Sequence, residues 1–500
     1  MKEYYLRVEG VNLSSVLEDT AQLSVVRGGS LLLRNVIKDI TKKWGEKWKG
    51  KLEPISTGAS MGLFRICSDK PEDLCNQLAT DLTLDPKFQH FTFVVDIQPG
   101  LKGDFRKTQE AITARSRFRQ LQQLSLALPP SNQSQSEPCK VDDLRPGDGR
   151  IKIRRTTGIE RPPVSRSVQE RHNFGRRRKW KFYEEEITEN GGVAPEIKAL
   201  RFSNELNEIA ASTRFDNLKN KLAVVYFDGN GFGSIQREHC KDAKALIRFD
   251  ETVQGYRRTF LKTFLLKISQ DRDFKTDDNR LQLETLLWGG DEITLVVPAW
   301  KGFWTLNYFY EQSKDWTYPI DDRNGIPLTH AGGLVFCHYK TPIVRTKKLA
   351  KDLADQVKDY LLGKERRNLF EYEVLESIDF PTEPVGTFWN RRFGALACCR
   401  QPLPPIPDWD KVKPELEKLL KDIPKGQVYE LANKGVKNPD AGFQEQRKRF
   451  MEVIRKDRFR ILEEVVKRLF PNAACEVWPW VHLLELWDYL ALDLEEPAHA

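Results

Sequence analysis

The sequence lacks the features of a membrane or exported protein. It has no run of about 18 consecutive apolar residues, the length that a helix needs to cross a bilayer, so we expect no transmembrane segment. The first residues, Met1–Leu6, enter a strand-like pattern and contain no hydrophobic leader region. The eight cysteines follow no regular spacing, which argues against a disulfide framework and favours a reducing compartment. We therefore predict a cytoplasmic protein that makes no contact with membranes.

Positive charge is in excess, and it is concentrated in one segment. The formal net charge is +8, and residues 150–181 contain twelve Lys or Arg residues but only two acidic ones, Glu160 and Glu170. Such a segment attracts phosphate backbones, and the neighbouring Trp180, Phe182 and Tyr183 offer faces on which bases can stack. A solvated basic loop would have the same composition. The sequence leaves these two interpretations open.

Length and composition indicate several domains with apolar cores. A chain of 500 residues exceeds the size at which single cores stop growing, and 40% of its residues are hydrophobic. Residues 1–121 fit a β-α-β-β-α-β, ferredoxin-like order. The segments that indicate it are Tyr4–Val8, Gly29–Ile40, Met61–Ile66, Asp69–Leu82 and Phe91–Ile97. Residues 122–199 are predicted to be a linker, polar and proline-containing at 129–138, followed by the basic segment.

Residues 200–365 repeat the same order with sharper signals. The expected strands are Leu222–Phe227, Leu281–Trp288, Ile293–Val297 and Thr329–His338, and the expected helices are Thr252–Ile268, Phe303–Lys314 and Arg345–Leu362. Residues 366–500 are proline-rich at first and then helical, at Lys411–Lys421, Phe443–Leu469 and Trp478–Leu490. The predicted fold class is α+β: two ferredoxin-like palm domains with a basic linker region and a helical C-terminal domain.

Two acidic signatures fall within the second of these domains. Asp228 follows the apolar run Leu222–Phe227, and Gly289-Gly290-Asp291-Glu292 lies between two predicted strands. In a palm, the first strand and the hairpin turn lie side by side at one end of the sheet. Asp228 and Asp291 are therefore expected to meet, although 63 positions separate them. Glu292 is the expected third carboxylate.

Clustered carboxylates of this kind suit Mg²⁺ or Mn²⁺. These ions prefer oxygen ligands, and Mg²⁺ usually completes its coordination with water and substrate phosphates. Two such ions activate an attacking hydroxyl and stabilise a leaving oxygen in an in-line displacement. The predicted reaction is attack of a ribose hydroxyl on the α-phosphate of a nucleoside triphosphate, with pyrophosphate leaving. The predicted catalytic and metal-binding side chains are Asp228, Asp291 and Glu292.

The glycines beside the acids have separate predicted roles. One pair permits a tight hairpin turn with positive φ, and the segment after Asp228 lets backbone N–H groups approach a triphosphate without hindrance from side chains. A surface hairpin turn can also have the sequence Gly-Gly-Asp-Glu for structural reasons alone. Its combination with the Asp228 segment favours the functional interpretation. The predicted nucleotide-binding residues of these two segments are Gly229, Asn230, Gly231, Phe232, Gly233, Gly289 and Gly290.

These motifs resemble the palms of GGDEF and class III nucleotidyl cyclases, and further stretches narrow the resemblance. Thr329–Pro342 followed by Ala350–Lys358 is similar to the Ala-Gly strand, His-x-Lys-x-Pro turn and Ala-x-x-Leu helix of the large palm subunit of type III CRISPR effector complexes. Phe202–Ala210 is similar to the same family, and Arg27–Ser30 with Thr57–Ser60 resembles its degenerate first palm. The resemblance covers residues 1–365 well and the C-terminus weakly.

The resemblance implies an enzyme that converts ATP into cyclic oligoadenylates when foreign RNA is sensed, with two palms facing each other around paired nucleotides. It also implies that the backbone of Gly229 contributes to the metal site and that Lys340 and Lys358 approach the triphosphate. A lysine at the end of a strand or helix is more often a solvated surface charge. RNA and CRISPR effector subunits are the implied partners, and a homodimer is compatible with the need for two nucleotides to meet.

Three departures from the family pattern are visible. Glu292 replaces the second Asp of the usual Gly-Gly-Asp-Asp, so we expect the metal geometry to shift. No His-Asp dipeptide occurs, and we predict no DNA-cleaving nuclease. Glu137–Pro146 looks like the first half of the family's Cys₄ zinc site with Asp142 in place of the second Cys, and no Cys pair follows, so we expect no zinc. These losses suit a divergent or stand-alone cyclase.

Two functions of different classes therefore compete. One is a Mg²⁺-dependent nucleotidyl cyclase or oligonucleotide synthetase that uses ATP or another NTP. The other is a catalytically inactive palm scaffold that binds RNA or protein subunits of a ribonucleoprotein complex. Three intact carboxylates favour the enzyme. A plain diguanylate cyclase is disfavoured, because Ile293 stands where that family has Phe. Base specificity, product size, activating signal and oligomeric state are not determined by the sequence.

Overall fold

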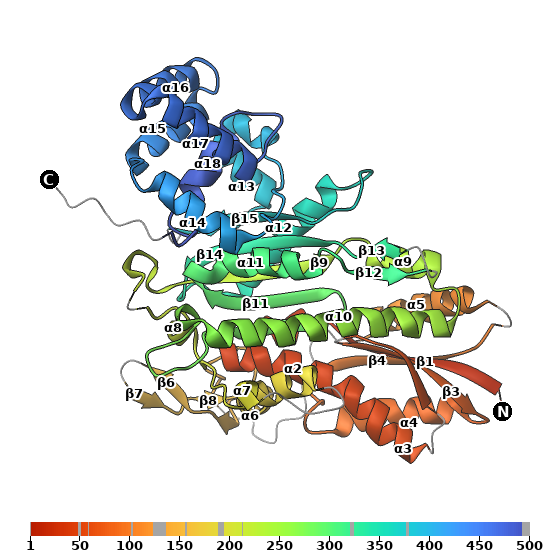
Figure 1. Ribbon diagram of the computed structural model, residues 1–500. Helices are drawn as coiled ribbons and strands as arrows, with labels where there is room; N and C mark the ends of the chain where they lie inside the picture. Colours follow the sequence, from red (N-terminus) through yellow and green to blue (C-terminus); the bar gives the residue numbers. More distant parts are fainter. Residues whose placement is uncertain are drawn as a thin grey trace.

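The computed structural model describes residues 2–48, 52–58, 60–101, 104–123, 137–155, 158–188, 195–212, 214–320, 325–376 and 380–492. Two α/β units lie one above the other in Figure 1, and a helical unit gathers at one end of the upper one. None of the helices in these ranges has the length and apolar character needed to span a bilayer. The predicted linker at 129–138 lies mostly outside the described residues.

The first unit confirms the predicted β-α-β-β-α-β order. Its sheet is antiparallel, with strand order β2-β3-β1-β4. Every strand of this sheet was predicted from the sequence except β2, a short strand whose pairing with β3 shifts register between Pro54 and Ser56. The elements are β1 (Lys2–Val11), α1 (Ser14–Leu17), α2 (Leu23–Asp39), a π-helical turn (Ile40–Trp44), α3 (Gly45–Lys47), β2 (Leu52–Thr57), β3 (Met61–Ser68), α4 (Pro71–Leu84), β4 (Thr92–Pro99) and α5 (Phe105–Leu121).

Part of the segment predicted as a linker is a packed helix, α6 (Arg166–Ile187), which lies against α2. Glycines allow the two helices to come unusually close. A Cβ on Gly28 would lie 1.7 Å from the carbonyl oxygen of Arg171, and one on Gly175 would lie 2.2 Å from that of Ser24. The predicted start of α2 at Gly29 is later than its actual start at Leu23, because Gly28 and Gly29 interrupt the helical pattern in the sequence. Gly28 therefore weakens the local helical signal but permits the close helix crossing.

The basic segment is divided between the interior and the surface. On the inner side of α6, the buried Arg171 pairs with Asp19 at 2.7 Å, and the buried Lys179 pairs with Glu284 at 2.9 Å. Phe182 and Tyr183 are buried as well, so the idea that they offer stacking faces to bases is wrong. On the outer side the exposed cations remain available to solvent: Arg166, Arg176, Arg177 and Lys181. Neither interpretation of this segment therefore describes all of it.

Short strands and helices connect the two α/β units. Within them Asp142, the residue in place of the expected second cysteine, accepts hydrogen bonds from the Arg145 guanidinium at 2.8 Å and the Ser165 hydroxyl at 2.9 Å. Its carboxylate is therefore used as a structural acceptor. The connecting elements are β5 (Gly149–Arg150), β6 (Ile153–Arg155), β7 (Gly158–Glu160), β8 (Pro163–Val164), α7 (Pro195–Lys198), α8 (Leu206–Ile209) and a 3₁₀ turn (Asp216–Leu218).

The second unit repeats the predicted order and adds a strand. Its sheet has the order β10-β11-β9-β14-β15, in which β15 pairs in parallel with β14. The predicted domain boundary at residue 365 therefore separates β15 from the sheet to which it belongs. The elements are β9 (Lys221–Gly229), α9 (Phe232–His239), α10 (Ala243–Gln270), a 3₁₀ turn (Arg272–Phe274), β10 (Glu284–Gly289), β11 (Glu292–Pro298), α11 (Ala299–Ser313), β12 (Thr317–Pro319), β13 (Gly325–Pro327), β14 (His330–His338), α12 (Ile343–Tyr360) and β15 (Leu369–Val374).

The two faces of this second sheet are covered differently. A Cβ on Gly302 of α11 would meet Ala223 of β9, whereas a Cβ on Gly333 of β14 would meet the carbonyl of Ala350 in α12. Gly333 pairs with Tyr226, and side chains alternate along a strand. Tyr226 and Asp228 therefore point to the α12 side, and Ala223 and Phe227 point to the α11 side. The helix α10 runs between the two α/β units (Figure 1).

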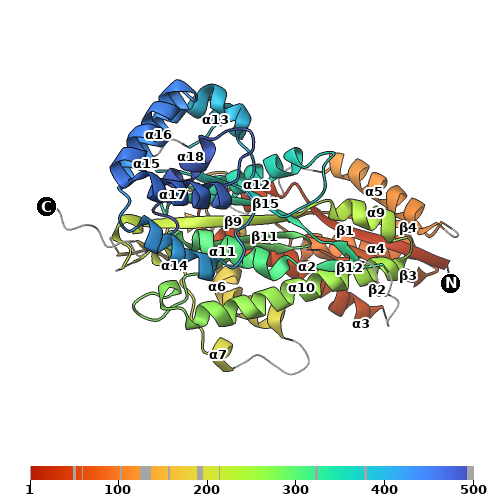
Figure 2. The ribbon, with the colours of Figure 1, turned by 45° about the horizontal axis from the view of Figure 1, so that its top comes forward.

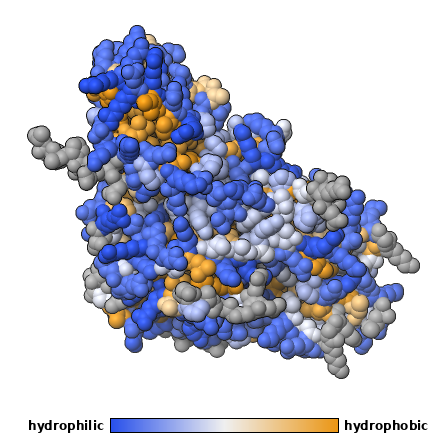
Figure 3. Space-filling model, in the orientation of Figure 1, coloured by the Kyte–Doolittle hydropathy of each residue, from blue (hydrophilic) through white to orange (hydrophobic). Residues whose placement is uncertain are grey.

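The C-terminal unit is helical, as predicted (Figure 2). One expected helix, Phe443–Leu469, is in fact two, because Arg455 adopts a φ of 71° and ends the first. Figure 3 shows a hydrophilic surface on this side of the molecule, with an apolar area over the C-terminal helices. The elements are α13 (Val385–Phe393), a 3₁₀ turn (Gly394–Cys399), α14 (Trp409–Leu420), α15 (Lys425–Lys437), α16 (Ala441–Ile454), α17 (Lys456–Leu469) and α18 (Trp478–Leu486).

Candidate active site

The three predicted carboxylates come together where β9 ends. Asp228 is the last residue but one of β9, and the β10–β11 hairpin runs alongside it. The register pairs Ile293 with Phe227, so the next position places Glu292 beside Asp228. Asp291 lies in the hairpin turn itself, where Gly290 adopts a φ of 50° that favours glycine. Packing of a local hairpin against a central strand thus joins two distant sequence signatures.

The negative charges of these carboxyls act on one another. Burial raises the pKa of Asp291 to about 6, and the negative charges of Asp228 and Glu292 add to the effect. Burial also raises the pKa of Asp228, against the opposing effect of the Lys358 ammonium group. Carboxyls that raise one another's pKa hold negative charge in a small space, and such a space attracts cations.

Two other side chains hold the carboxylates in place. The Tyr226 hydroxyl donates to Oε1 of Glu292 at 2.6 Å, and the Lys358 Nζ lies 2.6 Å from Oδ2 of Asp228. Lys358 belongs to α12, whose Lys347 and Lys351 lie on the same helical face. The charge of Glu292 acts on both of these lysines. The α12 side of the sheet therefore carries acids on the strands and a row of lysines above them.

The donor chemistry at this site fits Mg²⁺ or Mn²⁺, although the side chains do not form a ready ligand set. Three carboxylates supply the oxygen donors that these ions prefer. Within the described ranges, no group of three or more His, Cys, Asp or Glu side chains is arranged to hold one metal ion. Asp228 and Glu292 are instead engaged by Lys358 and Tyr226. Binding of an ion would require Asp228 to exchange its lysine partner for the metal.

The glycine segment after Asp228 has structural reasons for its composition. A Cβ on Gly229 would lie 2.5 Å from the Phe232 ring, and Gly231 adopts a φ of 68° at the start of α9. The backbone N–H of Asn230 donates to Thr329 at 2.8 Å, so this N–H is not free for a phosphate. The N–H groups of Phe232 and Gly233 lie in the first turn of α9, where a helix has no internal acceptors for them.

Lys340, one of the two predicted phosphate-binding lysines, is not at this site. The antiparallel pairing of β14 with β9 places His338 opposite Lys221, and Lys340 lies beyond that end of the sheet. Seven residues separate Lys221 from Asp228, which corresponds to about 23 Å along a strand. Lys340 and Lys358 therefore cannot act on one triphosphate at Asp228. The motif that suggested Lys340 forms a turn at the opposite end of the sheet.

Three cations near the site were not identified from the sequence. Lys347 and Lys351 could have been found from their helical spacing relative to Lys358. Arg366 could not, because it follows α12 in a short connection to β15. Its guanidinium lies 2.8 Å from the position that a Cβ on Gly231 would occupy. Contact between these distant segments is a tertiary feature.

A cavity of about 350 Å³ lies between the two α/β units, next to the hairpin turn. Gly289 and Gly290 line one side of it, and the buried Arg257 donates to the Gly290 carbonyl at 2.8 Å. Burial, together with the neighbouring charge of Arg34, lowers the pKa of Lys38 to about 8. The lining contains more basic than acidic residues, so positive charge outweighs negative charge around this cavity. Its charged lining residues are Arg34, Lys38, Lys42, Arg257, Arg258, Glu185, Glu186 and Asp250.

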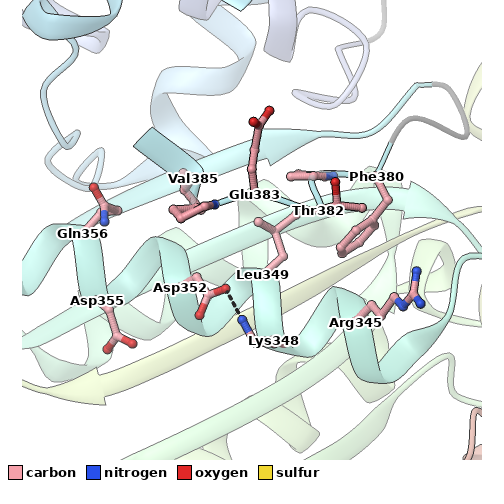
Figure 4. Close-up of a pocket in the computed structure, with 12 residues that line it drawn as sticks. Arg345, Lys348, Leu349, Asp352, Asp355, Gln356, Phe380, Thr382, Glu383 and Val385 are labelled. Atoms are coloured by element: carbon pink, nitrogen blue, oxygen red, sulfur yellow. Dashed lines mark hydrogen bonds and ion pairs between the residues drawn. The ribbon is translucent and has the colours of Figure 1, made fainter. Parts of the chain in front are cut away.

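A second hollow lies on the outer side of α12 and does not include the three carboxylates. It measures about 650 Å³ and is lined by α12 and by residues 380–385 (Figure 4). Its charged residues are largely neutralised within α12, since Lys348 pairs with Asp352 at 2.8 Å and Lys351 pairs with Asp355 at 2.6 Å. We assign it no part in the chemistry.

Comparison with solved structures identifies the fold of this chain. No protein-family model matches the sequence, and no curated protein is similar to it. Among solved structures, Csm1 in T. onnurineus has a TM-score of 0.51 at 14% sequence identity, over 97% of this chain and 69% of that chain. A Csm1–Csm4 subcomplex in the type III-A CRISPR-Csm interference complex has a TM-score of 0.49 at 11% identity, over 98% of this chain and 70% of that chain. At such identities the first likeness establishes a shared fold.

Proposed function

We propose that this chain, which has the fold of Csm1, is a divalent-metal-dependent nucleotidyltransferase of CRISPR-type antiviral defence. It would join nucleoside triphosphates, ATP first among them, into cyclic oligonucleotides by attack of a ribose hydroxyl on an α-phosphate. One observation supports this above all: Asp228, Asp291 and Glu292 converge at the end of β9, with Lys358 of α12 directly above.

Each group at the site has a part in this proposal. The three carboxylates would hold Mg²⁺ or Mn²⁺, which supplies the charge that activates a hydroxyl and neutralises phosphate oxygens. Lys358, released from Asp228, would donate to the triphosphate, and Lys351, released from Asp355, would add positive charge from two turns earlier on the same helix face. Arg366 would reach phosphates that approach the start of α9.

The cavity between the two units suits the second nucleotide that a condensation needs. It adjoins the Gly289-Gly290 turn, and its excess positive charge favours an anionic ligand. The buried Arg257 Nε has no hydrogen-bond partner there and could donate to such a ligand. Because both units belong to one chain, this cavity exists without a second copy of the protein.

Nucleotide turnover tests this proposal directly. Purified protein is incubated with Mg²⁺ and each labelled NTP, with and without RNA, and products are separated by chromatography. We expect an oligonucleotide product, and we expect Asp291→Asn to lower its rate by roughly a hundredfold or more, because losses at a metal's coordination shells are of this order. Lys340→Ala is the matched control and should keep the rate within about twofold, because Lys340 lies at the far end of the sheet. A wild-type rate in Asp291→Asn would contradict the assignment of the carboxylates.

The inactive scaffold is kept as a second candidate because of one observation. The outer side of α6 exposes Arg166, Arg176, Arg177 and Lys181, which could contact a phosphate backbone whether or not the carboxylates are active. Absence of product from every NTP, together with salt-dependent RNA binding that Arg176→Glu/Arg177→Glu weakens, would favour this function. Product formation would favour the enzyme.

A further inference from the structure

Tyr226 is a buried residue to which the sequence motifs assign no role. It lies on β9 two positions before Asp228, so both side chains point to the α12 side of the sheet. The register pairs Tyr226 with Thr294, and Glu292 lies two positions before Thr294. Glu292 therefore shares this face too. Period-two alternation on two paired strands brings the phenol and both carboxylates together.

The contacts of the phenol are specific. Its hydroxyl donates to Oε1 of Glu292 at 2.6 Å, and the hydroxyl oxygen lies 3.4 Å from Oδ2 of Asp228. The Tyr226 side chain is only 1% exposed, so packing prevents the ring from turning away. A buried hydroxyl is costly unless it has a partner, and here the partner is an ionisable group of the acidic site.

The position of the hydroxyl explains how Glu292 can remain beside Asp228. Two carboxylates that are adjacent on neighbouring strands repel each other, and a glutamate has three rotatable bonds by which it can swing away. A neutral donor between them offsets part of the repulsion and restricts Glu292 to one orientation. Lys358 of α12 restrains Asp228 in the same way, because its Nζ lies 2.6 Å from Oδ2 of Asp228. Phenylalanine at position 226 would fill the same space without this restraint.

We propose that Tyr226 is a positioning residue of the acidic site: its hydroxyl fixes Glu292 beside Asp228 and thereby sets the affinity of the carboxylates for a divalent cation. The inference rests on the proposed function, because it assumes that these carboxylates bind the divalent cation. It goes further in assigning the arrangement of the ligands to a residue that touches neither substrate nor metal.

Binding of Mn²⁺ alone, measured on the full chain by the electron paramagnetic resonance signal of the free ion, is the test. The variants are Tyr226→Phe and the matched control Tyr310→Phe, which removes another buried hydroxyl that donates to the Leu369 carbonyl at 2.7 Å, away from the carboxylates. We expect Tyr226→Phe to weaken Mn²⁺ binding roughly tenfold or more, the loss typical of a hydrogen bond to a charged group. Tyr310→Phe should stay within about twofold of the wild type. Circular dichroism checks that both variants are folded.

A double-mutant cycle separates positioning from a general loosening of the sheet. Glu292→Asp keeps the charge but withdraws the carboxylate from the phenol by one methylene. We expect Glu292→Asp alone to weaken Mn²⁺ binding, and Tyr226→Phe to have almost no further effect in that background. If Tyr226→Phe proves unstable, equal Mn²⁺ affinity in wild type and Glu292→Asp overturns the inference, because the orientation of the Glu292 carboxylate would then not set the affinity.

The outcomes distinguish this inference from the proposed function. Equal Mn²⁺ affinity in wild type and Tyr226→Phe overturns the role of Tyr226 and leaves the metal site standing. An equal loss in Tyr310→Phe, or an undiminished effect of Tyr226→Phe in the Glu292→Asp background, shows a structural role and also overturns it. If wild-type protein does not bind Mn²⁺ at millimolar concentrations, the metal site of the proposed function is refuted together with the inference.

Discussion

Replacing Glu284 with glutamine should destabilise the protein more than any exposed charge substitution. Glu284 is the first residue of β10, the strand that leads to the Gly289–Asp291 turn. Its carboxylate, 1% exposed, accepts from the Arg27 guanidinium at 2.8 and 2.5 Å and from Lys179 at 2.9 Å. Arg27 belongs to the first α/β unit and Lys179 to α6. This ionic contact therefore joins three parts of the chain behind the acidic hairpin.

The magnitude follows from what the substitution leaves behind. Burial tends to raise the pKa of Glu284, but the charges of Arg27 and Lys179 outweigh it and hold the pKa below its ordinary value. Removing one member of a buried ion pair costs about 3–5 kcal/mol, because the remaining charge stays buried. Arg27 keeps bonds to the carbonyls of Gly175 and Asn204, which soften the loss. We therefore expect the lower end, about 3 kcal/mol, a large share of the ~5–15 kcal/mol typical of proteins.

Urea denaturation followed by tryptophan fluorescence measures this loss, with Glu53→Gln as the control. Glu53 pairs with Arg65 on the surface of the first sheet, and exposed pairs are worth about 0–1 kcal/mol. The predicted order is a large loss for Glu284→Gln and almost none for Glu53→Gln. If the two variants unfolded at the same urea concentration, the reasoning from burial and charge would be refuted.

Two further results are expected. Gly28→Ala should destabilise the protein by about 1–3 kcal/mol or more, because the added methyl group forces α2 away from Arg171 of α6. Gly45 has open space around it, so Gly45→Ala should be neutral or stabilising by up to ~1 kcal/mol. Thermal unfolding of both variants checks this. Burial, helped by nearby arginines, lowers the pKa of His172 to about 4 from 6.5, so its contribution to stability is complete above pH 6.5 and is lost as the pH falls towards 4. Urea midpoints at pH 7.5 and 5.0 should therefore differ less in His172→Gln than in wild type, and an equal difference would count against a buried neutral ring.

Much of the fold could be predicted because its signals are local. Apolar runs of strand length and helical periodicity marked both β-α-β-β-α-β units, and Asp228 and the Gly289–Glu292 turn were placed at strand ends that the structure brings together. The predictions failed where a local signal was ambiguous. Gly28 and Gly29 weakened the start of α2, and Glu371 and Glu373 interrupt the apolar run of β15, which was grouped with the helical C-terminus.

The sequence by itself determined which residues form strands, helices and turns, and hence that the three acids would lie at the ends of strands. Only the tertiary structure decided which charges face those acids. It pairs Lys358 with Asp228 and places Arg366 beside Gly231. It also puts Lys340 at the far end of the sheet. Arg171 and Lys179 are buried in ion pairs. The physical reason is that alternation and periodicity are properties of neighbouring residues, whereas the partner of a charge is set by whichever distant element packs against it.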